Sequence, residues 1–410
     1  MIIGEHVVLL GAGSSVEAGL PTSVGLTRKI TDIIGTSGVR ETAHALNFAI
    51  GALVAHDTAR GGSVYAGVDV ERLFAAIRML SDRDSLEIAP FVANWNPALE
   101  GISRQDPFGN AVSRLQQEFL KVHPNSFSMK TMFDRAVRDA IGGGRSDAVY
   151  RSLQIQMIDA LRDCLELEGD TVDYLAPLLA IKETGDGPIR IASLNYDRSV
   201  ELLCGRAGME VTTGVSLWSG GYDWSWEAGA DVRLLKLHGS IDWMLGSVSR
   251  GAMSDEGIHV GPRGDHTGLS NGRIGVVFGQ REKLRSDGPF LAMLRELDEF
   301  LRAADHLTIV GYSFRDDHIN AAVRRWFNSC ADPHLTIIDP GLFKSQERSP
   351  FINSLRDAML MPFDSDTGTQ SLSPAHEILD VGAGEGLRQV FGSGPDLTSV
   401  VELRATLTED

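Results

Sequence analysis

The feature that most constrains the fold lies near the start of the chain, where the apolar run Val7 to Leu10 passes directly into Gly11-Ala12-Gly13-Ser14-Ser15. An apolar run that ends in glycine indicates a strand, and the pattern over residues 24–34 indicates a helix after it. In such a unit the turn's N–H groups and the helix N-terminus can face a pyrophosphate. A tight turn that binds no ligand is the alternative interpretation.

Strand patterns resume in the second half of the chain. Short apolar runs bounded by turn residues predict strands over residues 189–194, 232–237, 275–278, 306–310 and 335–338. They alternate with helical patterns over 290–304 and 319–327, which indicates a mostly parallel sheet buried on both faces. The Gly-, Ser- and Asp-rich segment 246–273 is expected to be an exposed, mobile loop. We therefore predict a Rossmann-like α/β fold.

A long helical segment separates the two parts of this sheet. Residues 42–56, 70–80 and 150–167 carry apolar residues at helical spacing, and the Pro- and Gly-containing segment 89–109 is expected to connect helices. We expect a first part of the Rossmann-like domain at 1–39, a helical insertion at 40–183, the remaining Rossmann-like part at 184–345 and a C-terminal extension at 346–410. The extension is expected to add a strand and a helix or to pack outside the sheet.

Charge and composition disfavour several classes of protein. The chain has 38 Lys and Arg against 55 Asp and Glu, a net charge of −17 that repels polyanions, so direct nucleic-acid binding is not expected. No apolar run approaches the roughly 18 residues of a membrane span, so a cytoplasmic protein without a membrane partner is expected. Cys164, Cys204 and Cys330 are too widely spaced for a disulfide framework or a paired-cysteine zinc site.

Polar side chains follow two of the predicted strands. Asn195 and Asp197 come just after one strand, and His238 follows the next. The carboxyl ends of parallel strands are where open α/β sheets bind ligands. Asn195 can hold a water or a ribose hydroxyl, and His238 can accept a proton near pH 7. The alternatives are helix N-caps for Asn195 and Asp197 and a structural role for His238.

Two further glycine turns occur later in the sequence. Gly311-Tyr312-Ser313 follows the strand predicted over 306–310, and Asp316 or Asp317 is expected to cap the next helix. The second turn, in the segment ILDVGAGEG over 378–386, imitates the nucleotide loop of a methyltransferase. Too few residues follow Gly386 to build the sheet that such a site needs.

Four of these segments, the turn at 11–15, the strand ends at 195–197 and 238, and the turn at 311–313, carry a family resemblance. Together and in this order, they resemble the sirtuin family, in particular the divergent bacterial branch associated with antiviral defence. The resemblance implies that Asn195 and Asp197 meet the ribose beside nicotinamide and that His238 is the catalytic base. It also implies an NAD-binding set at the glycine turns and strand ends, namely Gly11, Ala12, Gly13, Ser14, Ser15, Leu20, Pro21, Thr22, Ser193, Gly311, Tyr312, Ser313 and Asp339.

The departures of the chain from the protein-deacetylating sirtuins include the proline turn and the segment after His238. Thr22-Ser23-Val24 follows Pro21 where those enzymes have Asp-Phe-Arg, and no cysteine lies between His238 and Gly311, so their four-cysteine zinc module is absent and no zinc is expected. The resemblance therefore implies an NAD glycohydrolase that splits its substrate NAD into nicotinamide and ADP-ribose, as a defence effector that depletes NAD when triggered. The alternatives are an NAD-dependent protein deacylase and a non-catalytic sensor of NAD or ADP-ribose.

Two kinds of protein partner are expected. A long helical insertion must bury its apolar faces, which favours a homo-oligomer. The resemblance implies a hexameric helicase-type ATPase or an Argonaute-like protein as a second partner.

Overall fold

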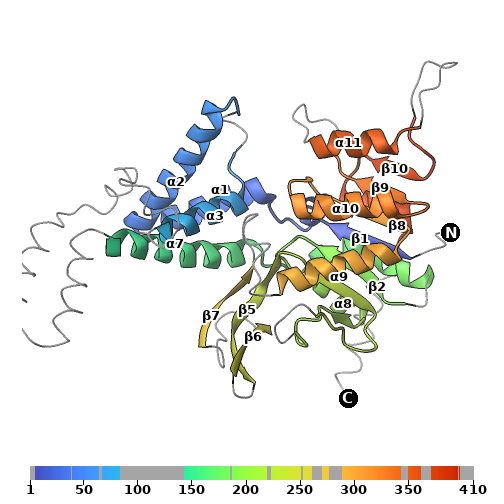
Figure 1. Ribbon diagram of the computed structural model, residues 1–410, viewed down its shortest axis with the longest axis horizontal. Coiled ribbons are helices and arrows are strands. Elements are labelled where there is room, and N and C mark those ends of the chain that lie inside the picture. The colour runs from blue at the N-terminus through green and yellow to red at the C-terminus, as the bar shows by residue number, and fades with distance from the viewer. Residues whose placement is uncertain are drawn as a thin grey trace, which may run out of the picture. The chain divides into compact units, whose positions relative to one another are not determined.

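A computed structural model describes residues 5–37, 39–63, 67–83, 143–184, 187–218, 223–250, 253–260, 270–276, 289–342, 350–361, 371–395 and 397. The chain forms two compact units, one made of Met1–Thr22 with Leu165–Asp410 and the other of Ser23–Cys164 (Figure 1). The helical unit therefore begins at Ser23 and ends at Cys164, whereas the sequence suggested 40–183. The difference arises because α1 (Ser23–Thr36) packs on other helices and the segment after Cys164 packs on the sheet.

The first unit is built on a seven-stranded sheet in the described part of the chain, with strand order β10-β9-β8-β1-β2-β4-β3. Every pair of neighbouring strands in it is parallel, which confirms the predicted α/β fold with a mostly parallel sheet. The strands are β1 (His6–Leu10), β2 (Ile189–Ser193), β3 (Val211–Thr212), β4 (Val232–Lys236), β8 (His306–Val310), β9 (His334–Ile338) and β10 (His376–Leu379). The C-terminal extension thus contributes an edge strand.

Helices bury both faces of this sheet because side chains alternate along each strand. Val7 and Leu9 of β1 belong to one apolar cluster, with α9 (Phe290–Ala303), α10 (Asp317–Ser329) and α11 (Pro350–Met359). Val8 and Leu10 belong to the other, with the 3₁₀ helix η4 (Gly169–Thr184), α8 (Ser199–Ala207) and α12 (Ala383–Phe391). Each such buried aliphatic side chain contributes about 1.5–3 kcal/mol, so the central strand is held from both sides.

A second, three-stranded sheet corrects two sequence-based expectations. The segment predicted as a loop over 246–273 contains most of an antiparallel sheet formed by β5 (Gly239–Arg250), β6 (Met253–Val260) and β7 (Ser270–Val276). The strand predicted over 275–278 ends at Val276 in this sheet, not in the parallel one, and residues 277 and 278 lie outside the described residues. The composition was misleading because backbone pairing, such as Arg250 opposite Met253, stabilises strands even where few residues are apolar.

The helical unit consists, in its described part, of α1 (Ser23–Thr36), α2 (Arg40–Ala59), α3 (Val70–Ser81) and α7 (Gly143–Cys164). Helix α3 begins where Asp69 accepts hydrogen bonds from the N–H groups of Glu71 and Arg72, and it buries Leu73 and Ile77 at helical spacing. The predicted linker over 89–109 lies outside the described residues. None of the helices in the described ranges is long and apolar enough to cross a membrane.

A row of histidines occupies the amino ends of adjacent strands. His6, His306 and His334 begin β1, β8 and β9 and pair in register. Their rings stack, with centroids 5.6 Å apart for His6 and His306 and 4.5 Å apart for His306 and His334. Burial and the neighbouring His306 lower the pKa of His6 to about 3, so this ring is neutral in the folded protein at neutral and mildly acidic pH.

We expect this neutral ring to make the fold acid-sensitive. The pKa of His6 is near 6.5 in the unfolded chain and about 3 in the folded one. Below pH 6.5 the unfolded state therefore gains a proton that the folded state does not, and stability falls with pH. Between pH 7.5 and pH 5, the unfolding free energy of the wild type should fall further than that of His6→Gln. The difference should be roughly 1–2 kcal/mol in urea titrations. His56→Gln, at an exposed histidine of α2, is the control and should behave as wild type.

Candidate functional site

The sequence-predicted site residues follow neighbouring strands of the parallel sheet. Leu10, the last residue of β1, pairs with Ser193 of β2 and with Val310 of β8. Ser193 also pairs with Lys236 of β4. Asn195 lies two residues beyond Ser193 and His238 lies two residues beyond Lys236, so both follow the same paired position in the sheet. The order β8-β1-β2 places later strands on both sides of β1, which is the switch point where open sheets bind ligands.

The first glycine turn is held by backbone hydrogen bonds to the turn after β8. The N–H of Gly11 donates to Val310 O over 2.9 Å, and the N–H of Gly13 donates to Gly311 O over 2.8 Å. The N–H of Ser14 donates back to Gly11 O over 2.9 Å, within the short 3₁₀ helix η1 (Ala12–Ser15). These three N–H groups are engaged within the fold, whereas the sequence suggested that the turn directs its N–H groups at a pyrophosphate.

Asn195 joins the end of β2 to this turn. Its Nδ2 lies 3.0 Å from Gly11 O, 3.1 Å from Ser14 Oγ and 3.0 Å from Ser15 Oγ. Its own N–H donates to Ser193 Oγ over 3.1 Å. The side chain is buried, and its Oδ1 has no hydrogen-bond partner among the residues that the structure describes. Asn195 therefore presents a preoriented buried acceptor.

Asp197 supports Asn195 through Ser15. Its Oδ2 accepts a hydrogen bond from Ser15 Oγ over 2.8 Å, and its Oδ1 accepts one from the N–H of Ser199 over 3.0 Å at the start of α8. The N-cap residue of α8 is Arg198, so Asp197 is not the cap expected from the sequence; it accepts from the first N–H of the helix and contacts the glycine turn. Both oxygens are used within the fold, so Asp197 acts as a buried support beneath the turn.

A buried ion pair that the sequence analysis missed lies beside Asp197. Lys236, the last residue of β4, donates from Nζ to the backbone carbonyl of Asp197 and lies 3.3 Å from Glu201 Oε1. Burial raises the pKa of Glu201, whereas the nearby Lys236 lowers it. The available signal was a lysine within an otherwise apolar strand, because a charge there needs a partner.

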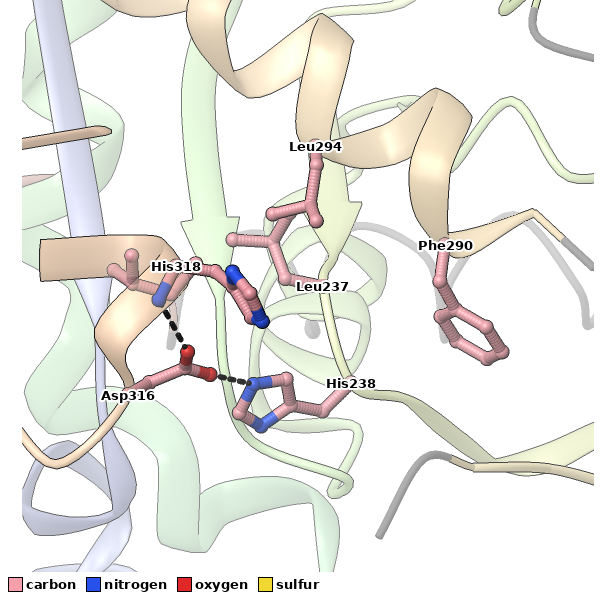
Figure 2. A pocket seen from close by; sticks show the side chains of 7 residues that line it. Leu237, His238, Phe290, Leu294, Asp316 and His318 are labelled. Atoms are coloured by element: carbon pink, nitrogen blue, oxygen red, sulfur yellow. Dashed lines mark hydrogen bonds and ion pairs between the residues drawn. The ribbon is translucent and has the colours of Figure 1, made fainter. Parts of the chain in front are cut away.

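His238 lies in a pocket with a carboxylate beside it (Figure 2). Its Nε2 is 2.9 Å from Asp316 Oδ2, and its ring centroid is 6.2 Å from that of Tyr196. Asp316 Oδ1 accepts a hydrogen bond from the N–H of His318, which confirms Asp316 as the N-cap of α10. The residues that line the pocket are Leu237, His238, Phe290, Leu294, Asp316, His318 and Ile319.

The other predicted NAD-binding residues have mixed environments. Gly311 contacts the first glycine turn, and Tyr312 is buried with its hydroxyl group near Asp316. Asp339 accepts hydrogen bonds at Oδ1 from the N–H groups of Gly341 and Leu342 on its own loop. Leu20 is buried and Pro21 is half-buried, whereas Ala12, Thr22 and Ser313 are exposed.

The methyltransferase-like turn is occupied by a side chain of the chain itself. The N–H of Gly384 donates to Glu17 Oε1 over 2.9 Å, and a Cβ on Gly382 would lie only 2.6 Å from the same oxygen. Glu17 lies two residues after the first glycine turn, which Tyr174 also holds by donating to Ser14 O over 2.6 Å. Burial, with smaller effects of Asp197 and Glu17, raises the pKa of Tyr174, so this hydroxyl stays a donor. The C-terminal extension therefore helps to anchor the candidate site.

Metal ligation finds little support in the described ranges. There, no group of three or more His, Cys, Asp or Glu side chains is arranged to hold a metal ion. Cys164, Cys204 and Cys330 are free thiols. Burial raises the pKa of Cys204 to about 12, which keeps this thiol protonated and unreactive.

The contact between the two glycine turns predicts a large effect of Gly311→Ala. Gly311 has φ of +60°, and its Cβ would lie 2.3 Å from Ser14 N and 2.4 Å from Gly13 C. Left-handed strain and overpacking should together lower the unfolding free energy by about 2–4 kcal/mol, measured in urea titrations. Gly205→Ala in α8 is the matched control, because its Cβ meets no heavy atom within 4 Å and should be neutral or stabilising. Unchanged stability of Gly311→Ala would contradict the close approach.

Comparisons with known proteins place a domain of known type on this part of the chain. Residues 190–356 match the family model described as SIR2-like domain. No curated protein matches the sequence. Among solved structures, a mutant Sir2 homologue in complex with 2′-O-acetyl-ADP-ribose is similar with 13% identity over 97% of this chain and 92% of that one, at a TM-score of 0.34.

Two other Sir2 structures are similar at the same level. One is Sir2 with an inhibitor, 2′-O-acetyl-ADP-ribose and a deacetylated peptide, with 13% identity over 94% of this chain and 92% of that one, at a TM-score of 0.36. The other is Sir2 bound to an acetylated peptide, with 12% identity over 94% of this chain and 91% of that one, at a TM-score of 0.34. The structural similarity to sirtuins is distant, and the match to the SIR2-like domain model covers residues 190–356.

Proposed function

We propose that this protein is an NAD glycohydrolase, which cleaves NAD to nicotinamide and ADP-ribose. The observation that carries the proposal is the Asn195 amide. Its donor nitrogen is held by the first glycine turn, while its acceptor oxygen is buried without a partner among the described residues. A ribose hydroxyl or a water that donates a hydrogen bond would satisfy this oxygen. The SIR2-like domain supports NAD as the molecule that supplies that ribose.

The proposed reaction breaks the bond between the nicotinamide nitrogen and C1 of the ribose. The pair of electrons in that bond leaves with nicotinamide, which departs neutral and so needs little acid catalysis. The ribose becomes an oxocarbenium-like cation, and water forms the new bond to C1. The proton of that water passes to His238, which then returns it to solvent.

Asn195 and Asp197 have supporting roles in this mechanism. Asn195 orients the attacking water or the ribose hydroxyls through Oδ1, which contributes by positioning and not by proton transfer. Asp197 holds Ser15, which in turn holds Asn195, and its negative charge would stabilise the forming cation. The remaining predicted residues of the glycine turns and of the loop after β9 would surround the dinucleotide.

The biological role that we propose is that of an antiviral-defence effector, which depletes NAD when triggered. The resemblance to the defence-associated branch supports this role. The trigger would come from assembly, either as a homo-oligomer through the helical unit or with a hexameric helicase-type ATPase or an Argonaute-like protein. NAD is a substrate in this scheme, and no zinc takes part.

The first test is nicotinamide release from NAD with no peptide present. In its activated state, the wild type should release one nicotinamide and one ADP-ribose per NAD, assayed with the purified assembly or as NAD loss in bacterial cells that express it. His238→Ala should lower turnover about a hundredfold or more, the usual range for a lost general base, and should keep the calorimetric NAD affinity within several-fold. His334→Ala is the matched control, because this partly exposed histidine lies at the opposite end of the sheet and should keep full activity.

Other outcomes would favour the alternative functions. Nicotinamide release that requires an acylated peptide and removes its acyl group would identify a deacylase. Tight NAD or ADP-ribose binding with no NAD turnover under any activating condition would identify a sensor. Full NAD hydrolysis by folded His238→Ala would overturn the proposed base.

A further inference from the structure

The contact between His238 and Asp316 joins two parts of the chain that are 78 residues apart in sequence. His238 follows β4, and Asp316 lies at the start of α10. The side chains are only 5% and 4% exposed, and both line the same pocket (Figure 2). A buried hydrogen bond between a carboxylate and an imidazole is strong because little water competes for it.

The loop that carries Asp316 is built to hold this carboxylate in place. The N–H of Asp316 donates to Tyr312 Oη over 3.2 Å, and Asn320 Nδ2 donates to Phe314 O over 3.0 Å. Phe314 has φ of +54°, a left-handed conformation that is unfavourable for a bulky residue. Its buried ring packs on Tyr312 and Phe351. Such strain persists only where the surroundings enforce it, and here they orient the Asp316 side chain.

We propose that Asp316 is a positioning residue that selects the tautomer of His238. A carboxylate only accepts hydrogen bonds, and a neutral imidazole has a single N–H. The hydrogen of neutral His238 therefore resides on Nε2, which faces Asp316, and the lone pair resides on Nδ1. Nδ1 is then the nitrogen that takes the proton in the proposed NAD hydrolysis, and this part of the inference rests on the proposed function.

The geometry also explains how the charge on His238 is held after proton transfer. When Nδ1 takes a proton, Nε2 keeps its hydrogen bond to Asp316, and the imidazolium forms beside a carboxylate. In this proposal Asp316 acts through His238 and takes no proton itself. The same carboxylate caps α10 through Oδ1, so each of its oxygens has a separate role.

Asp316→Asn separates these two roles, because Asn is as good an N-cap as Asp. An amide nitrogen facing Nε2 would favour the opposite tautomer, with the hydrogen on Nδ1. We expect turnover of NAD to fall by roughly 10²–10⁴-fold, as for a histidine base in the wrong tautomer, with NAD affinity within several-fold of wild type. Asp317→Asn is the matched control, because it changes the next, exposed carboxylate of the same helix turn and should leave turnover unchanged.

Histidine ¹⁵N NMR reads the tautomer directly and does not depend on activity. In labelled wild-type protein at neutral pH, we expect protonated Nε2 and unprotonated Nδ1 for His238, assigned by the loss of its signals in His238→Gln. Asp316→Asn should reverse this pattern, and a merely structural role would not.

The combined results distinguish failure of this proposal from failure of the proposed function. A wild-type His238 with its hydrogen on Nδ1, or Asp316→Asn with wild-type turnover and an unchanged tautomer, would overturn the role of Asp316 and leave NAD hydrolysis intact. If the wild type hydrolyses no NAD, the NMR spectra still decide the tautomer.

Discussion

The candidate site depends on the close approach of two backbone turns at the carboxyl end of β1 and β8. Gly11 and Gly13 lie against Gly311, and a Cβ on any of the three would come within 3 Å of the opposite turn. The approach permits the hydrogen bonds from the N–H groups of Gly11 and Gly13 to the Val310 and Gly311 carbonyls. Because side chains are excluded there, the two turns act as one rigid base for the polar groups around them.

The loop after β8 connects this base to the candidate proton acceptor. At its beginning, Gly311 packs on the first glycine turn, and at its end, Asp316 reaches His238. The first glycine turn also holds the side chain of Asn195. Two residues further on, the backbone carbonyl of Asp197 accepts a hydrogen bond from Lys236, which lies two residues before His238. Asn195 and His238 are therefore positioned by a common set of contacts, although no hydrogen bond joins them directly in the described residues. Rigid positioning of this kind is what cleavage at an anomeric carbon requires from a protein.

The sequence predicted much of the parallel sheet because its strands are apolar and bounded by turn residues. β1, β2, β4, β8 and β9 lie at or within two residues of the expected positions. The antiparallel sheet was missed because β5, β6 and β7 are rich in Gly, Ser and Asp, and strands of that composition depend on pairing with their neighbours. The Asp316 side chain was predicted only as a helix cap, since a local pattern contains no information about a partner 78 residues away.

The sequence by itself determined most strands of the parallel sheet, the glycine turns and the polar residues at the strand ends, because these follow from local periodicity and backbone sterics. Only the tertiary structure decided how those groups are used. It turned the N–H groups of Gly11 and Gly13 toward the neighbouring turn, filled the methyltransferase-like turn with Glu17, and placed Asp316 beside His238. The physical reason is that a buried donor or acceptor must find a partner, and only the packing of strands, loops and helices decides which groups are near enough to serve.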